Sequence, residues 1–403
     1  MTAGAWLDVS RRFGSGLRLR QAAPGGRPGP TNARVAGMAD GAIAGSLSVL
    51  FLYDVSDEIR LDALRAIMGA PPPGREPPFR HHAPEYVHFA QPPVLEPLKA
   101  PAFGGSEWSA GRVAYYDYGV VSLLLELPVQ GTWDDAISLA VRWMNAPDLE
   151  QRAADAVRWH VEQVAAALVN PYQERLSEDY FIFHLHAIQD EAGATVTATQ
   201  LLETHGDAIA QIVRGERACF AAAERSEILS SRMSYYETDL LVAGWSAAFL
   251  YDTPEGARST IQLLEYANTQ LLDFRHYDAV LTGKLADAYR SLERGTGFLA
   301  RWRLAREAGR LNTLRLDVRE LTERVDNSIK FLSDMFAARL YRMAAAKIGV
   351  PDYRSLVDEK LRSTGELYGF LMDQFHQGRA FILELMVVVI LIIELVFLFR
   401  GKG

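Results

Sequence analysis

Hydrophobic and polar residues follow two different patterns along this chain of 403 residues. Between residues 38 and 253, short apolar runs with a period of two alternate with stretches in which apolar residues recur every three or four positions. The first pattern is typical of β-strands and the second of amphipathic helices. From residue 254 onward only the helical period remains. The sequence therefore predicts an α+β body followed by a helical C-terminal part.

The first α+β segment is predicted over residues 38–147. Residues 46–54 (SLSVLFLYD) form a run of β-formers, and the amphipathic helix after them ends at Gly69. A short strand is expected at 85–90, and two strands within 111–127 meet near residues 117–119. A helix over 134–144 begins after Thr132, a typical N-cap residue. This order predicts a mostly antiparallel sheet with helices on one face, a sandwich of two layers.

The second α+β segment is predicted over residues 148–253, and its order resembles that of the first. A helix over 148–169 should end at Asn170-Pro171, and a strand follows from 179. Helices are expected at 199–214 and 224–231, and the strand pair LLVAG and WSAAFLYD completes the segment.

The helical part consists of one long helix (254–297) and a predicted antiparallel hairpin (298–379). Apolar residues recur at heptad spacing in the first arm of the hairpin, at Leu311, Leu314, Val318, Leu321, Val325 and Leu332. Gly349–Pro351 breaks the pattern, which resumes at Val357, Leu361, Thr364, Tyr368, Leu371 and Phe375. Such coiled-coil-like seams pack either against the body or against another copy of the chain.

Residues 380–399 predict a C-terminal transmembrane helix. These twenty residues contain no Lys, Arg, Gly or Pro, and their only charges are Glu384 and Glu394. A helix of this length spans roughly 30 Å, the thickness of the hydrocarbon core of a bilayer. A charge at mid-depth costs about 2.5–3.5 kcal/mol, so both acids are expected either to be neutral or to make polar contacts with a neighbouring helix.

The net charge and the cysteine count exclude some functions and structural features. The formal net charge of −8 argues against direct nucleic-acid binding, which depends on clustered Lys and Arg. Cys219 is the only cysteine, so an intrachain disulfide and a Cys-based zinc cluster are both excluded. Residues 1–37 carry six arginines against one aspartate, with many Gly and Pro. We expect a disordered leader, or a translation start at Met38, and a targeting peptide is the alternative.

Candidate chemistry is sparse. His184 and His186 alternate on one strand face, as two metal ligands would, but no companion motif lies nearby, and a core position is the expected explanation. The aromatic and acidic runs at 115–118 and 235–237 fit amphipathic strand ends, with ligand stacking as the alternative. The helical stretch 263–278 collects polar residues (Glu265, Asn268, Asp273, Arg275, His276 and Asp278), which predict a polar network between helices.

No glycine-rich phosphate loop, GxSxG, HExxH or paired-carboxylate motif occurs in the sequence. We therefore predict no catalytic residue, no cofactor and no metal site.

Two stretches resemble the YagE / required-for-meiotic-nuclear-division family of single-pass membrane proteins. The first is the apolar C-terminus with acids ten residues apart, and the second is VAYYDYGVVSLLLEL (113–127) around Tyr118-Gly119-Val120-Val121. Residues 133–240 depart from that family's pattern. The resemblance implies a membrane protein without established catalytic residues, and a mitochondrial inner-membrane location for eukaryotic members.

These observations together predict a membrane-anchored, non-enzymatic scaffold or assembly factor that associates with itself through its C-terminal helices. The expected location is the bacterial inner membrane with the body in the cytoplasm, or the mitochondrial inner membrane if the chain is eukaryotic. The expected partners are the lipid bilayer, further copies of the chain and other proteins. The alternatives are a small-ligand sensor or enzyme using the α+β body, and an oligomeric ion or proton path using Glu384 and Glu394.

Overall fold

The structure is a computed structural model that describes most of the chain beyond residue 42. The described residues are 43–69, 92–98, 108–186, 188, 195–293, 309, 312, 313, 315, 316, 318, 319 and 335–400. All of these residues belong to one compact unit of the chain. The leader, the strand predicted at 85–90 and most of the first hairpin arm lie outside the described residues.

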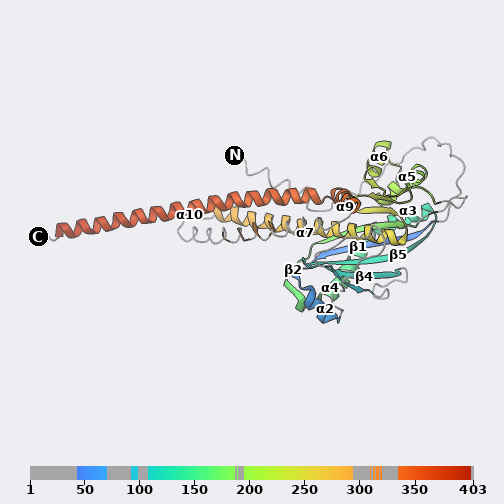
Figure 1. The fold of residues 1–403 in the computed structure, drawn as a ribbon. Coiled ribbons are helices and arrows are strands. Elements are labelled where there is room, and N and C mark those ends of the chain that lie inside the picture. Colours follow the sequence, from blue (N-terminus) through green and yellow to red (C-terminus); the bar gives the residue numbers. More distant parts are fainter. Residues whose placement is uncertain are drawn as a thin grey trace. The chain divides into compact units, whose positions relative to one another are not determined.

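The body is built on one eight-stranded sheet, in which strands from both predicted α+β segments take part (Figure 1). In spatial order the strands are β3 (Val94–Pro97), β4 (Ala110–Tyr115), β5 (Val120–Gly131), β1 (Ile43–Asp54), β7 (Ser177–Leu185), β10 (Ala247–Tyr251), β9 (Leu240–Ala243) and β8 (Arg232–Met233). Only β7 and β10 pair in parallel; the other neighbours are antiparallel. A second sheet pairs β2 (Ser56–Ile59) with β6 (Leu168–Pro171).

The long strand β1 lies at the centre of the sheet, and its side chains are buried on both faces. Val49 and Phe51 belong to one hydrophobic core, and Leu50 and Leu52 belong to the other. A strand that is buried on both faces has apolar residues at successive positions, which explains the uninterrupted run VLFLY at residues 49–53. The structure is therefore α+β with a large mixed sheet, and the prediction of helices on one face only is wrong because both faces of β1 are apolar.

Among the helices that the structure describes in full, five pack against the first face and three against the second, which is also contacted by Val318. The first core holds residues of α2 (Leu61–Met68), α3 (Trp133–Met144), α4 (Leu149–Gln163), α5 (Ala198–Arg214) and α6 (Ala222–Ser230). The second holds residues of α7 (Pro254–Glu293), α9 (Met335–Ile348) and α10 (Val350–Arg400). The helical part of the chain thus covers one face of the sheet made by the body.

Several helix ends lie at the capping residues predicted from the sequence. The Thr132 hydroxyl and the Asp135 carboxylate form a capping box at the start of α3. Gly69 ends α2 in the left-handed conformation, at φ 64°. Helix α4 ends at Gln163, earlier than predicted, and the short 3₁₀ turn Ala165–Ala167 leads into β6. Pairing with β2 draws residues 168–171 out of the helix.

Helices α7 and α10 run side by side in the same direction (Figure 1). Lys360 of α10 contacts Asp278 of α7 at 2.5 Å. Further along both helices, Ala288 of α7 packs in one small cluster with Leu367 and Tyr368 of α10. The contacts advance together along both helices, so the pair is parallel.

The transmembrane helix predicted over 380–399 is wrong. Within the described part of the chain, no helix is both long enough and apolar enough to cross a bilayer. Glu384 and Glu394 divide this segment, and its longest run without a charge, residues 385–393, falls well short of the about 20 residues that a spanning helix needs. These residues belong instead to the continuous helix α10. The membrane localisation and the tail anchor rested on this segment and are corrected with it.

The turn between β4 and β5 yields the first testable prediction. Gly119 has φ +91°, and a Cβ atom there would lie 1.7 Å from the backbone oxygen of Ser56. Gly69 also has positive φ, but nothing lies within 4 Å of its added Cβ. We expect Gly69→Ala to cost about 1 kcal/mol through backbone strain alone. Gly119→Ala should cost at least about 3 kcal/mol, because the turn must move as well.

Urea denaturation of the two variants measures this difference directly. Equal losses of unfolding free energy in both would show that the close approach of residues 56 and 119 does not constrain the fold.

Candidate functional site

A row of polar side chains on α7 faces the sheet and lies buried in the second core. Glu265, Thr269 and Asp273 are four residues apart, and His276 follows three residues later. With 3.6 residues per turn, these positions share one helix face. Glu265 and Thr269 are fully buried, and Asp273 is nearly so. We call Glu265, Thr269, Asp273 and His276 the α7 polar row.

At the first end of the row, Glu265 forms a buried ion pair with a residue of the sheet. Arg112 of β4 donates from Nη1 to Glu265 Oε1 at 3.2 Å and from Nη2 to Glu265 Oε2. Burial opposes the charge on Arg112, but the Glu265 carboxylate outweighs it and raises the pKa of the guanidinium. Burial also raises the pKa of Tyr116 on the same strand face well above its ordinary value, so this hydroxyl stays protonated.

The other end of the row pairs a histidine with the end of β1. His276 Nδ1 lies 2.6 Å from Asp54 Oδ2. The ring of Tyr172 stacks on His276 with centroids 4.7 Å apart, and the Tyr172 hydroxyl donates to Asp57 Oδ1 at 2.6 Å. Burial raises the pKa of Asp54, and the contact with His276 partly offsets that rise. This end therefore joins α7 to the end of β1 and to the loop after β6.

Asp273 lies between the two ends as a carboxyl group that favours its neutral form. Burial raises its pKa well above the ordinary value, and the nearby carboxylates of Asp54 and Asp117 raise it further. One turn earlier, the hydroxyls of Thr269 and Tyr118 are hydrogen-bonded at 2.8 Å. A neutral acid fits here because a third negative charge beside two carboxylates is unfavourable.

The polar row connects a helix to the sheet, whereas the sequence predicted a network between helices. Arg275 pairs with Glu178 at the start of β7, not with a carboxylate of its own helix. Asp278 does reach another helix, through Lys360 of α10. Among the described residues, no group of three or more His, Cys, Asp or Glu side chains is arranged to hold a metal ion. The chemistry of the row is ion pairing and hydrogen bonding that fix α7 on the sheet.

The two strand histidines lie together, and one of them is built into the core. Their ring centroids are 4.9 Å apart. His184 Nε2 lies 3.1 Å from the backbone oxygen of Asp252, and burial lowers the pKa of His184 to about 4. A neutral His184 donating from Nε2 to this carbonyl explains its position without a ligand.

The tyrosine runs are divided between the two faces of the sheet and its surface. The Tyr115 hydroxyl donates to Glu96 Oε2 at 3.0 Å on the first face, and His160 Nδ1 lies 3.1 Å from the same oxygen. Tyr235 and Tyr236 are exposed, and their backbone N–H groups donate to the Asp239 carboxylate. The structure thus does not bring these runs together into one site.

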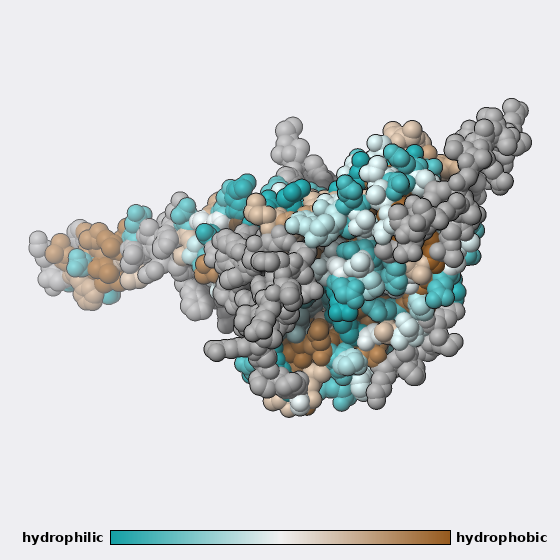
Figure 2. Space-filling view, turned by 45° about the vertical axis from the view of Figure 1, so that its right-hand side comes forward, coloured by the Kyte–Doolittle hydropathy of each residue, from teal (hydrophilic) through white to brown (hydrophobic). Residues whose placement is uncertain are grey.

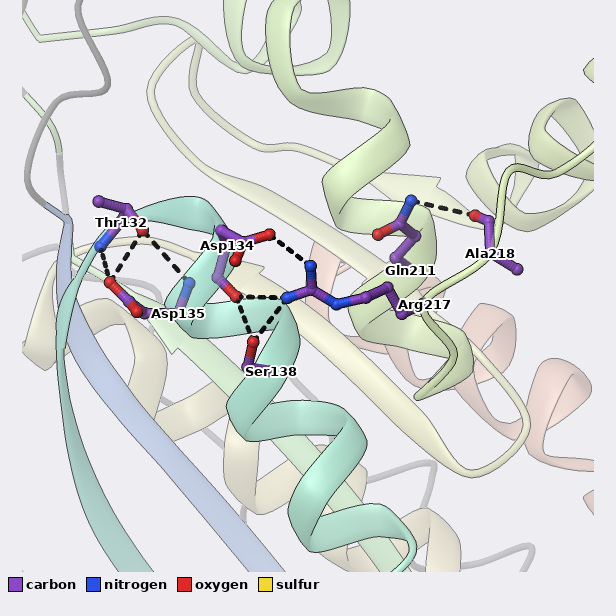
Figure 3. Close-up of polar contacts among 7 residues, drawn as sticks. All are labelled: Thr132, Asp134, Asp135, Ser138, Gln211, Arg217 and Ala218. Carbon is purple, nitrogen blue, oxygen red and sulfur yellow. Dashed lines mark hydrogen bonds and ion pairs between the residues drawn. The ribbon is translucent and has the colours of Figure 1, made fainter. Parts of the chain in front are cut away.

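A surface clamp on α3 was not predicted from the sequence (Figure 3). Arg217 donates from Nη1 to Asp134 Oδ1 at 2.7 Å and from Nη2 to Ser138 Oγ at 2.6 Å. Gln211 Nε2 donates to the Ala218 carbonyl at 3.0 Å, which holds the loop that carries Arg217. The partners are about 80 residues apart in sequence, so no local pattern signals this clamp. Arg112 was also missed, although its strand face was readable from Ala114 and Tyr116.

Glu384 and Glu394, predicted to make helix contacts in a membrane, are both exposed on α10. Twelve large apolar residues between Met386 and Leu398 are exposed as well, by 45% to 72%. Figure 2 shows hydrophobic side chains gathered along this end of the helix. We call residues 386–398 the apolar end of α10.

The buried ion pair gives the second prediction. Arg112→Ala leaves the Glu265 carboxylate buried without its partner, and we expect a loss of about 3–5 kcal/mol in unfolding free energy. Replacing both residues, as Arg112→Met with Glu265→Leu, should cost less than the single change. Chemical denaturation of both variants tests this. A double variant as unstable as the single one would show that the pair is not coupled.

The neutral acid gives the third prediction. A carboxyl whose folded pKa is raised holds its proton more tightly in the folded state, so its contribution to stability is lost as pH rises above its ordinary pKa. Asp273→Asn mimics the neutral form at every pH. We therefore expect the variant to gain stability relative to the parent chain as pH is raised from 4 to 8. Urea midpoints across this range measure the difference, and a constant gap would contradict the raised pKa.

Comparison with known proteins corrects the predicted resemblance. A family model described as "Uncharacterized protein MJ0711, N-terminal domain" matches residues 44–258, which hold all of the eight-stranded sheet except Ile43 at the start of β1. The resemblance to the YagE / required-for-meiotic-nuclear-division family is therefore wrong. Tyr118 and Gly119 lie in the turn between β4 and β5, Val120 and Val121 begin β5, and the apolar C-terminus lies outside the matched residues.

The chain is also similar to the "Uncharacterized protein MJ0711" of Methanocaldococcus jannaschii. The two are 19% identical over 171 residues, which is 42% of this chain and 52% of the relative. The chain thus spans about half the length of that relative. No solved structure matches this chain. Because the family model covers more than half of the sequence, the chain belongs to the MJ0711 N-terminal domain family.

Proposed function

We propose that this protein is a non-enzymatic scaffold or assembly factor whose copies associate through the apolar end of α10. The observation that carries this proposal is the continuous exposure of Met386–Leu398. Soluble monomers rarely leave a contiguous apolar patch of more than a few hundred Å² uncovered, and larger patches mark interaction sites.

The exposed area is large enough for a stable interface. Twelve side chains that are each about half exposed present on the order of 1,000 Å² of apolar surface, compared with about 800 Å² per partner in a standard interface. Burying such an area at about 25 cal/mol per Å² contributes tens of kcal/mol before the cost of association is subtracted. Another copy supplies an apolar surface of equal length.

The distribution of apolar residues favours a bundle over a pair. Residues 386–393 are apolar without interruption, so they cover every side of the helix. A two-stranded coiled coil buries only the stripe of a and d positions. A helix that is hydrophobic all round needs neighbours on several sides, which three or more copies provide.

The helices before the apolar end support the same arrangement. Val357 and Thr364 of the predicted heptad seam are buried, and Leu361 and Tyr368 are half-buried. Val318 of the preceding arm is buried in the same core as Val357. We propose that these two arms form the predicted antiparallel, coiled-coil-like hairpin, which holds the apolar end on a stiff support.

The non-enzymatic character rests on how the polar groups of the α7 polar row are used. Glu265 pairs with Arg112 of β4 and His276 pairs with Asp54 of β1, so both side chains fasten α7 to the sheet. The formal net charge of −8 also disfavours direct contact with nucleic acid. The expected partners are further copies of the chain and other proteins recruited to the assembly.

Self-association gives the fourth prediction. Leu391→Lys with Leu395→Lys places two charges in the apolar end, and we expect the oligomer to dissociate to monomer in size-exclusion chromatography with light scattering. Trp159→Lys changes an equally exposed apolar residue on α4 and should leave the oligomer intact. Glu384→Gln with Glu394→Gln should strengthen association, because copies in a parallel bundle bring like charges together.

Two results would overturn the proposal. The first is a monomeric parent chain at concentrations of about 10–100 μM, well above the Kd of ordinary stable complexes. The second is recovery of the monomer on lipid vesicles with no crosslinked dimers or larger species, which would identify another occupant for the apolar end.

A further inference from the structure

An open, solvent-facing cavity of about 480 Å³ lies between α10 and the segment that holds Arg315 and Arg319. Three arginines line it, together with Leu361, Gly365 and two carboxylates. Its volume falls within the range of about 300–1,000 Å³ that is common for small-molecule sites. Neither the α7 polar row nor the apolar end of α10 contributes a lining residue.

Helical spacing explains why the arginines converge. Arg315 and Arg319 are four residues apart and lie on one face of their segment. On α10, Arg362 shares its face with Asp358 and Glu366, one turn before and one turn after. Two helical faces with guanidinium groups therefore border the same space, and most of the charged residues at its rim are exposed.

The walls of the cavity are anchored in the core. Val318, next to Arg319, is fully buried in the second core, and Leu361 of the cavity wall packs against that core. Both flanks of the site are thus held by apolar packing, which keeps the arginines near each other.

Gly365 makes room for one of the guanidinium groups. A Cβ atom at this position would lie 2.9 Å from Nη1 of Arg315, so the Arg315 guanidinium lies almost against the α10 backbone. In the described part of the chain, neither Arg315 nor Arg362 forms an ion pair or a hydrogen bond. Two guanidinium groups that are free to bind therefore face one cavity.

We propose that this cavity binds a small organic phosphate. A planar guanidinium matches a phosphate group through two parallel N–H···O bonds, and several arginines around one anion are typical of phosphate sites. The surface of Leu361 and the space above Gly365 accommodate the carbon part of such a ligand.

The two carboxylates select against a bare anion. Asp358 and Glu366 lower the net positive charge of the site, and they repel any ligand that is only negative. Both can accept hydrogen bonds from hydroxyl groups. A phosphate ester of a polyhydroxylated compound, such as a sugar phosphate, satisfies both the arginines and the acids, whereas inorganic phosphate satisfies only the arginines.

Isothermal titration calorimetry of the full chain with ribose 5-phosphate tests the proposal. We expect saturable binding that weakens at least tenfold in Arg315→Ala and in Arg362→Ala. Arg315→Lys should also weaken binding, because it retains the charge but loses the forked donor geometry. Arg342→Ala removes an exposed arginine of α9 that does not line the cavity, and it should bind like the parent chain. Inorganic phosphate should bind more weakly than the sugar phosphate.

Three outcomes would overturn the proposal. The first is no saturable binding at about 10 mM ligand, a concentration that fills even a weak site with Kd near 1 mM. The others are equal weakening of binding in Arg342→Ala and equal affinity for inorganic phosphate. Circular dichroism confirms that each variant is folded before titration. The result is independent of self-association, since none of these substitutions changes residues 386–398.

Discussion

The ion pair between Arg112 and Glu265 connects the two halves of this protein. The α+β body ends in a sheet whose second face is apolar, and the helical part must cover that face. Apolar packing alone allows a helix to slide along a flat surface. Glu265 is fully buried, so only the register that places it against Arg112 avoids an unpaired buried charge. The pair of Asp54 and His276, about three turns further along α7, fixes the position of this helix on the sheet at a second point.

Two constraints on α7 also orient the helix that packs beside it. Helix α7 lies on the sheet at its beginning and on α10 at its end, where Lys360 meets Asp278. The position of α10 relative to the body therefore depends on the polar contacts of α7. A proposed assembly through the end of α10 would hold the bodies of its members in a defined orientation.

Local patterns in the sequence predicted most helices and strands because the signals act within a few residues. Thr132 with Asp135, the left-handed Gly69 and the apolar run of β1 are of this kind. Contacts between distant segments were not predictable. The pairing of Glu265 with Arg112 and of Arg217 with Asp134 depends on which strands are neighbours, and that is decided by the whole sheet. The apolar C-terminus shows a further limit, since hydrophobicity alone does not identify what contacts an exposed apolar helix.

The central position of β1 affects how the chain is made. Its partner β7 begins at Ser177, more than 120 residues after β1 ends at Asp54. At about 5–20 residues per second, a ribosome needs on the order of ten seconds to produce that stretch. During this time one edge of a long apolar strand has no partner, which favours pairing with another nascent chain. Synthesis of this protein should therefore depend on chaperones that bind the nascent chain early, more than its final stability would suggest.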